Sequence, residues 1–222
     1  MKTHALTGSV LMAALAVVNA GSAPASDEEP AADAQRVMAK GTFVRIGYND
    51  EGWVTLGYRT ANHSVGEEWM VLEVGVTLQQ GVSGQTLRRS DIALLTPDGK
   101  VVTLASQEDF REAGYLTALN RRASVARDPV DYFPASVRSA CRLSFFANPT
   151  GDSSARLAQD ELELGSQRAC VGRLYFHLPD GIGLGPYTLG VKFTRTMVRV
   201  PFRIMTKDEA KELKKKLDEK GQ

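Results

Sequence analysis

The chain has 222 residues, with 27 Lys and Arg against 26 Asp and Glu, which gives a formal net charge of +1 at pH 7. Such a balanced charge provides no overall attraction to nucleic acid or to an anionic membrane, and we expect no nucleic acid as a partner. The length fits one large domain or two small ones.

Residues 1–20 have the layout of a secretory signal peptide. Lys2 gives a positive start, residues 10–18 form an apolar stretch, and Val18-Asn19-Ala20 offers small residues where a signal peptidase reads. The stretch is shorter than the roughly 20 residues that span a bilayer. We therefore expect a periplasmic or secreted protein that has no transmembrane segment after cleavage. The loss of Lys2 leaves 26 basic and 26 acidic residues, so the mature chain is formally neutral.

The next segments predict a disordered spacer followed by a β domain. Residues 21–40 are rich in Ala, Pro, Ser and acidic residues, which is typical of a disordered spacer. Residues 41–205 alternate between apolar and polar side chains in short runs separated by turn residues, as in strands. The expected strands cover 42–48, 53–58, 69–78, 92–95, 101–104, 142–146, 172–178, 187–193 and 198–204.

Two helical segments accompany the strands. Residues 106–126 carry apolar side chains at helical spacing after Ser106 and Asp109, a pair that resembles a capping box. Thr206 and Glu209 form the same signal for a helix over 206–222. Pro201 favours an edge strand. The pattern predicts a mainly β fold, an immunoglobulin-like antiparallel β-sandwich with a short helical insertion at about 106–126 and a C-terminal helix.

The two cysteines, Cys141 and Cys170, lie 29 residues apart in a chain that we expect to reach an oxidising compartment. This predicts a disulfide bond. A thiol metal or redox site is the alternative, although the sequence contains no CxxC motif. The mature chain has two histidines, His63 and His177, and no HExxH, GxSxG, GxGxxG or P-loop motif. We therefore assign no catalytic residue, no metal ligand and no cofactor.

The helical insertion concentrates positive charge in a neutral mature chain. Its expected binding residues are Arg111, Tyr115, Arg121, Arg122 and Arg127. Arginine pairs well with phosphate and carboxylate groups, and Arg and Tyr are enriched where partners bind most strongly. We expect an envelope protein or an anionic ligand, such as a phosphate or a glycan carboxylate, to contact this surface. The alternative is a solvated helix face.

One resemblance adds to this interpretation. The long strand Trp69–Leu78, followed by Leu94-Leu-Thr-Pro-Asp-Gly-Lys100, resembles exported bacterial immunoglobulin-like domains in which a central strand leads to such a hairpin. The chain as a whole is similar to uncharacterised exported bacterial proteins with a signal, paired cysteines and a Pro-Phe-Arg-Ile ending. The resemblance implies a sandwich, and it carries no activity and no site residues.

These patterns favour an exported, non-enzymatic binding or assembly protein of the bacterial cell envelope. Two alternatives stay open. One is an envelope hydrolase that takes His177, Asp180, Ser144 and His63 from separate loops. The other is a metal-handling periplasmic protein that uses His63, His177 and methionines.

Export predicts a defined N-terminus. The mature protein should begin at Gly21, because the small residues before it follow an apolar stretch of the length that signal peptidase substrates carry. Intact mass measurement or N-terminal sequencing of protein from the envelope fraction tests this. A retained Met1 in that fraction would contradict the prediction.

Overall fold

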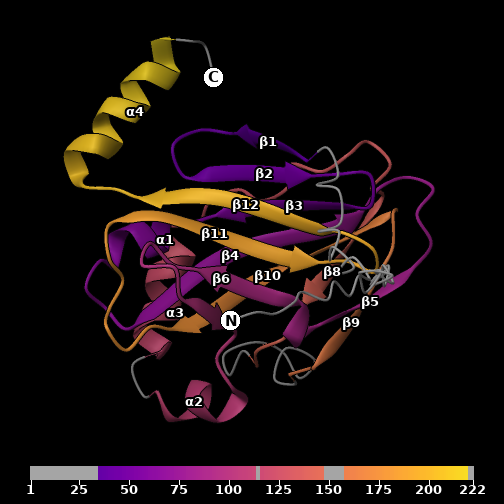
Figure 1. Cartoon of the computed structure of the whole chain (residues 1–222), viewed down its shortest axis with the longest axis horizontal. Coiled ribbons are helices and arrows are strands. Elements are labelled where there is room, and N and C mark those ends of the chain that lie inside the picture. The colour runs from indigo at the N-terminus through magenta and orange to yellow at the C-terminus, as the bar shows by residue number, and fades with distance from the viewer. Residues whose placement is uncertain (1–34, 114–115, 148–157, 220–222) are drawn as a thin grey trace, which may run out of the picture. The chain divides into compact units, whose positions relative to one another are not determined.

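The computed structural model describes residues 35–113, 116–147 and 158–219 (Figure 1). This part of the chain is mainly β, with largely antiparallel sheets and four α-helices. The expected signal peptide, most of the expected spacer and Tyr115 fall outside the described residues.

The largest sheet has six strands, and its centre is the ten-residue strand β4. Neighbouring strands are antiparallel except for β10 and β8, which run parallel. In spatial order the strands are β1 (Arg36–Ala39), β2 (Val44–Tyr48), β3 (Gly52–Gly57), β4 (Trp69–Leu78), β10 (Arg168–His177) and β8 (Ser139–Leu143).

Two smaller antiparallel sheets complete the strands. The four-stranded sheet has the order β12 (Met197–Ile204), β11 (Gly185–Lys192), β6 (Ile92–Leu95) and β7 (Val101–Thr103). The two-stranded sheet pairs β5 (Gln85–Arg88) with β9 (Glu161–Leu164). The helices are α1 (Arg59–His63), α2 (Gln107–Glu112), α3 (Leu116–Val125) and α4 (Lys207–Glu219), with a 3₁₀ turn at Arg89–Asp91.

The core lies between the six-stranded and four-stranded sheets. Along β12 every second side chain is buried, which is the period of a strand with one wet face. Gly47 of β2 lies directly below this strand, where a Cβ atom would come within 2.9 Å of Val200. The five alternate residues from Met70 to Leu78 that the sequence places on one face of β4 are all completely buried. One continuous apolar cluster therefore joins the two sheets.

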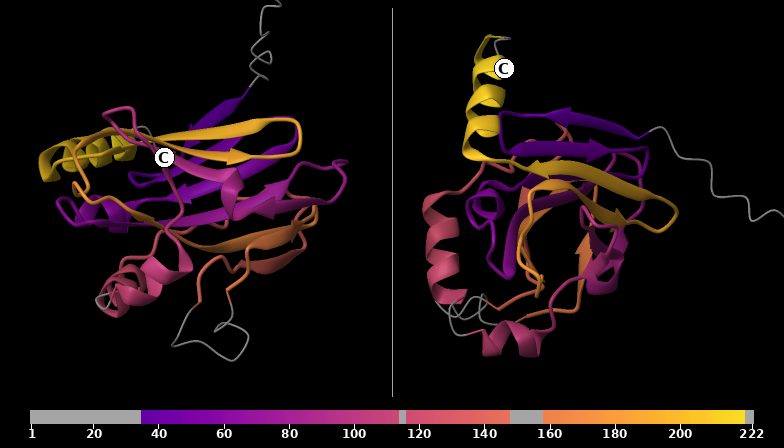
Figure 2. Two further views of the ribbon diagram at one scale, coloured as in Figure 1. Left: turned by 60° about the horizontal axis from the view of Figure 1, so that its bottom comes forward. Right: turned by 60° about the vertical axis from the view of Figure 1, so that its left-hand side comes forward.

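β4 is buried on its other face too. The segment after α3 covers that face, because the carbonyl oxygen of Tyr132 accepts hydrogen bonds from Trp53 Nε1 (2.8 Å) and Thr55 Oγ1 (3.1 Å). The ring of Phe133 lies where a Cβ atom on Gly75 would come within 2.4 Å of it, so only glycine fits there. Figure 2 shows α2 and α3 on the side of the six-stranded sheet away from β11 and β12. The helical insertion thus closes the second face of the central strand.

The expected disulfide is confirmed. Cys141 of β8 and Cys170 of β10 are paired residues in the parallel register, and their sulfur atoms are bonded. A loop of this length corresponds to about 3–4 kcal/mol of stabilisation in the chain-entropy model. The parallel pair corrects the expectation of a purely antiparallel fold. β8 and β10 are joined by a long connection, and such a connection allows parallel pairing whereas a short hairpin does not.

Other sequence expectations agree in part with the structure. The turns at 49–52 and 97–99 form hairpins, and β12 with Pro201 is an edge strand of its sheet. Both capping boxes form, with Asp109 N donating to Ser106 Oγ and Glu209 N donating to Thr206 Oγ1. β1 lies inside the stretch 21–40 that was expected as spacer, and α1 contains His63, which was expected in a loop. Both elements are five residues or fewer, too short to show a period. An immunoglobulin-like topology stays a prediction.

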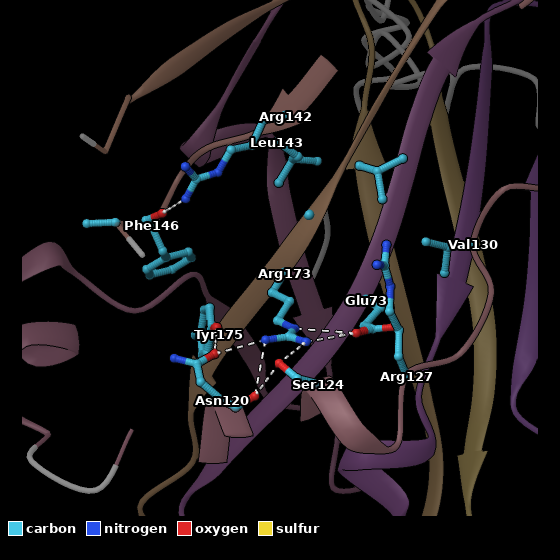
Figure 3. A pocket seen from close by; sticks show the side chains of 13 residues that line it. Glu73, Asn120, Ser124, Arg127, Val130, Arg142, Leu143, Phe146, Arg173 and Tyr175 are labelled. Atoms are coloured by element: carbon cyan, nitrogen blue, oxygen red, sulfur yellow. Dashed lines mark hydrogen bonds and ion pairs between the residues drawn. The ribbon is translucent and has the colours of Figure 1, made fainter. Parts of the chain in front are cut away.

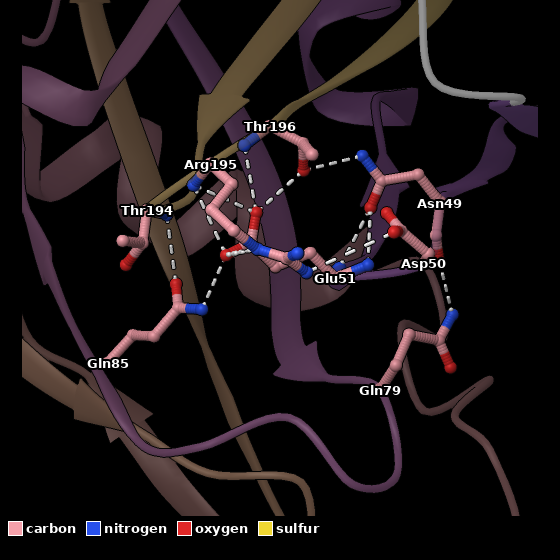
Figure 4. A network of polar contacts seen from close by, with 9 residues as sticks. Asn49, Asp50, Glu51, Gln79, Gln85, Thr194, Arg195 and Thr196 are labelled. Carbon is pink, nitrogen blue, oxygen red and sulfur yellow. Dashed lines mark hydrogen bonds and ion pairs between the residues drawn. The ribbon is translucent and has the colours of Figure 1, made fainter.

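A buried carboxylate joins two turns at one end of the molecule (Figure 4). Glu51, in the β2–β3 turn, is completely buried. Its carboxylate accepts hydrogen bonds from the backbone N–H groups of Arg195 and Thr196, from Thr196 Oγ1 and from Gln85 Nε2, at 2.7–3.2 Å. Burial raises the pKa of Glu51, but these hydrogen bonds outweigh it and hold the pKa below its ordinary value of 4.5. Glu51 therefore fastens the β11–β12 turn to the six-stranded sheet.

Replacing this carboxylate should destabilise the fold. Glu51→Gln should lower the free energy of unfolding by about 3 kcal/mol, because a buried amide NH2 group would face N–H donors that now bind an anion. The pKa of Glu51 is lower in the folded state, so its stabilisation is present above pH 4.5 and is lost as the pH falls through the folded value. Urea unfolding should therefore show the difference between the two proteins shrinking in acid.

Asp50→Asn is the matched control. The Asp50 side chain is 64 % exposed and lies 4.0 Å from Arg195, so this change should cost less than about 1 kcal/mol. Equal effects of the two substitutions would contradict a fastening role for Glu51.

Candidate functional site

A cavity of about 360 Å³ lies between α3 and the edge of the six-stranded sheet (Figure 3). Its wall combines polar side chains from four separate elements. Asn120 and Ser124 come from α3, Glu73 from β4, Arg173 and Tyr175 from β10, and Arg142 from β8, with Arg127 and Val130 from the segment after α3. We call this cavity the α3 pocket.

The inner wall of the α3 pocket is a hydrogen-bonded cluster around Arg173. Its Nε and Nη2 atoms donate to Glu73 Oε1 at 3.3 Å, and Nη2 also donates to Ser124 Oγ at 3.1 Å. Nη1 donates to the backbone oxygen and to Oδ1 of Asn120, both at 3.3 Å. The hydroxyl of Tyr175 donates to the same Oδ1 atom. Arg173 thus has a partner on each of its three nitrogens and fixes α3 against β4 and β10.

Glu73 is the buried anion of the pocket. Its side chain is 7 % exposed, and its Oε2 atom forms an ion pair with Nε of Arg127 at 3.9 Å. Burial raises the pKa of Glu73, and the charges of Arg173 and Arg127 oppose that shift without cancelling it. Burial also raises the pKa of Tyr175. A carboxyl group with a raised pKa in a cavity is a recognised mark of a functional site.

Two buried atoms of the pocket wall make no hydrogen bond with any described residue. They are Oε2 of Glu73, an acceptor, and Nη1 of Arg142, a donor. The other terminal nitrogen of Arg142 donates to the backbone oxygen of Phe146 at 3.4 Å. Buried polar groups nearly always have a partner in folded proteins, so these two atoms are unsatisfied groups in the wall of the pocket.

An aromatic cluster supports the pocket from below. The rings of Phe110, Phe146 and Tyr175 lie 4.8–4.9 Å apart between centroids, and the guanidinium of Arg89 lies 4.6 Å from the ring of Phe146. Close aromatic packing restricts side-chain rotation. The phenol of Tyr175 is therefore held in place beside Asn120.

The arginines that the sequence predicts as binding residues make different contacts in the structure. Arg127 lines the α3 pocket. Arg122 forms a two-pronged ion pair with Glu67, at 2.7 and 2.5 Å, which anchors α3 to the loop after α1. Arg121 is exposed and lines a separate cavity of about 400 Å³ beside His63. Arg111 is exposed on α2, and Tyr115 lies outside the described residues.

The residues considered for a hydrolase each contact a different partner. His177 lies 3.7 Å from Glu68 and stacks on Trp69, whereas His63 packs edge-on against Phe43. Ser144 Oγ donates to Gln159, and Asp180 pairs with Lys100. In the part of the chain that the structure describes, no three His, Cys, Asp or Glu side chains gather as a metal site would need. None of the helices described there has the length and apolar character to cross a membrane.

Most of the α3 pocket is formed by residues that no sequence motif marks. Glu73, Arg142 and Arg173 were not singled out, although Glu73 is the one acid in the apolar run Trp69–Leu78. A lone charge inside a buried strand is costly unless it is paired, so its position was an available signal. Arg142 and Arg173 carry no such signal, because charged residues are ordinary on half-exposed strands.

The comparisons with known proteins identify no relative. No protein-family model matches the chain, and neither do the curated proteins or the solved structures searched.

The two neighbouring arginines of α3 should differ in their contribution to stability. Arg122→Ala should lower the free energy of unfolding by about 1 kcal/mol, because it removes a charge-assisted pair with a partly buried carboxylate. Arg121→Ala should change it by less than about 0.5 kcal/mol. Urea unfolding at low and high salt measures both, and salt should weaken the effect at Arg122. If the Arg121 variant loses as much stability, the anchoring role of Arg122 is wrong.

Proposed function

We propose that this protein is an exported, non-enzymatic binding protein of the bacterial cell envelope, and that its ligand occupies the α3 pocket. The scaffold would be an immunoglobulin-like sandwich, with the helical insertion forming one wall of the binding site. The disulfide supports export, because such bonds persist in oxidising compartments. The observation that carries the proposal is the polar wall of one cavity, which includes Glu73 and Arg142, each with a buried atom that makes no hydrogen bond with a described residue.

The charge of the pocket favours an anion. Three arginines line it, against one carboxylate, so the wall is positive even when Glu73 is ionised. Arg173 is occupied by Glu73, Asn120 and Ser124. A ligand would therefore bind Arg127, which lies 3.9 Å from Glu73, and Arg142, which makes one long hydrogen bond to Phe146. Guanidinium groups bind carboxylate and phosphate through charge-assisted hydrogen bonds.

The acceptor atom Oε2 of Glu73 narrows the class of ligand further. Glu73 Oε2 needs a donor, and a ligand hydroxyl would supply one while the ligand carboxylate binds Arg142. A small acid that carries hydroxyl groups satisfies both atoms, whereas a simple carboxylate satisfies only one. A cavity of about 360 Å³ accommodates a molecule of the size of a single sugar acid. A uronic acid, the carboxylate-bearing unit of acidic glycans, has this chemistry.

Thermal unfolding with a matched set of probes tests this function. Glucuronate should stabilise the protein, and by about 2.7 kcal/mol at a concentration 100 times its Kd, whereas glucose should not. Arg142→Met should remove most of the effect, because it keeps an unbranched apolar side chain and deletes the guanidinium. Arg111→Met, which changes an exposed arginine outside the pocket, should leave the stabilisation unchanged.

Two results would contradict the proposal. Equal stabilisation by glucose would show that charge plays no part. No stabilisation by glucuronate or phosphate, with the Arg142→Met protein as stable as the original, would indicate that water alone fills the pocket. The function would then have to lie on another surface, of which the exposed face of α3 around Arg121 is the first to examine by crosslinking in native envelopes.

A further inference from the structure

A second concave surface lies beside the C-terminal end of β12, where α4 begins. α4 packs on the core through Ala210 and Leu213, near its N-terminal end. Its first turn is fixed by the capping box at Thr206 and by an ion pair between Glu209 and Arg203 at 3.2 Å. Between α4 and the body of the domain lies a groove of about 820 Å³, which we call the α4 groove.

The floor of the α4 groove is apolar and firmly held. Phe43 and Met205 are buried there, at 7 % and 6 % exposure. The backbone N–H of Met205 donates to Oδ1 of the buried Asn62 of α1 at 2.7 Å, which fixes the position at which α4 begins. The floor is therefore part of the core and not a gap beneath a loose helix.

Large apolar side chains also stand exposed at the rim of the groove. Val65 is 45 % exposed and Leu184 is 49 % exposed, and they lie on two different loops. Together with the floor they form an apolar surface whose exposure to water is unfavourable. Apolar surface of this kind, arranged as a cavity, is typical of a site that takes an apolar ligand.

One wall of the groove is strongly basic. Lys207, Lys211 and Lys214 follow one another at spacings of four and three residues, which places them on the same face of α4. None of the three forms an ion pair with a described residue. No Asp or Glu of the described chain lines the groove, and the guanidinium of Arg59 on the opposite wall is already bound to Asp128.

This charge is local and is not a property of the helix as a whole. α4 carries five lysines and five acids between Lys207 and Glu219, and the acids lie away from the groove. Lys216, nine residues after Lys207, stands about 180° round the helix from it and does not line the groove. Three lysines and no acid of α4 line the groove, which gives it a positive wall above an apolar floor.

We propose that the α4 groove binds an anionic amphiphile with a single acyl chain, of the fatty-acid class. The acyl chain lies on Phe43, Met205 and Leu184, and the carboxylate lies among the three lysines. The volume of the groove falls within the range of small-molecule sites, and its charge complements an anionic head group. This site is separate from the α3 pocket and does not depend on the function proposed there.

Calorimetric titration of the purified chain with monomeric dodecanoate tests the site. Dodecanoate should bind saturably, more weakly as the salt concentration rises. Dodecyltrimethylammonium has the same chain with the opposite charge, and butyrate has the same head group with little chain. Both should bind at least about tenfold more weakly, because each lacks one of the two interactions.

Matched variants locate the site. Lys211→Glu combined with Lys214→Glu should weaken dodecanoate binding about tenfold or more, and Leu184→Asp should do the same from the other wall. Lys216→Glu, on the opposite face of α4, should leave binding unchanged, and so should Arg142→Met in the α3 pocket. The melting temperatures of the lysine variants should equal that of the original protein, because every substituted lysine is exposed. A loss of binding in these variants is then not due to unfolding.

Three results would overturn the proposal. Equal binding of dodecyltrimethylammonium would show an apolar surface without charge selection. Binding of phosphatidylglycerol vesicles without binding of monomeric dodecanoate would show that the surface recognises a bilayer and not a single chain. Full dodecanoate binding by the double lysine variant and by Leu184→Asp would place the site elsewhere.

Discussion

The fold depends on one strand that has no exposed face. All ten residues of β4 are buried, so the six-stranded sheet needs cover on both sides. The four-stranded sheet covers one side with the alternate residues of β11 and β12. The helical insertion and the segment after it cover the other, through hydrogen bonds to the carbonyl of Tyr132 and the packing of Phe133 on Gly75. The insertion is therefore a third layer of the domain, and its removal would expose the strand at the centre of the sheet.

The burial of β4 also makes a carboxylate at position 73 energetically costly. Glu73 lies on the face that α3 covers, where burial penalises its charge. Arg173 satisfies one oxygen of the carboxylate, and the other makes no hydrogen bond with a described residue and lies 3.9 Å from Nε of Arg127. A polar group that is only partly satisfied lowers stability, so its presence in a well-packed sheet points to a use beyond folding.

Glu51 and Glu73 make the distinction clear because both carboxylates are buried. Glu51 receives hydrogen bonds on both oxygens, and the hydrogen bonds lower its pKa despite burial. Such a group stabilises the ionised form and serves the fold. Glu73 has one oxygen without a hydrogen bond to a described residue, and its pKa is raised in spite of two nearby arginines. Two residues of the same type and burial therefore differ in role because their hydrogen-bond partners differ.

The sequence by itself determined the local features of this protein. Alternation predicted most strands from residue 42 onward, but not β5 or β9, and it placed β8 three residues too late. Ser106 and Thr206 marked the two helical segments, and the number of cysteines predicted their bond. These signals act over a few residues, so they are readable without a fold. The parallel register of β8 and β10 is not readable from the sequence, because it pairs segments 29 residues apart, and β1 and α1 are too short to show a period. The same holds for both proposed sites. Glu73, Arg142 and Arg173 lie up to 100 residues apart in the sequence and meet only where three strands and α3 pack together. The sequence set which groups were available, and tertiary packing decided which of them became paired and which of them line a cavity.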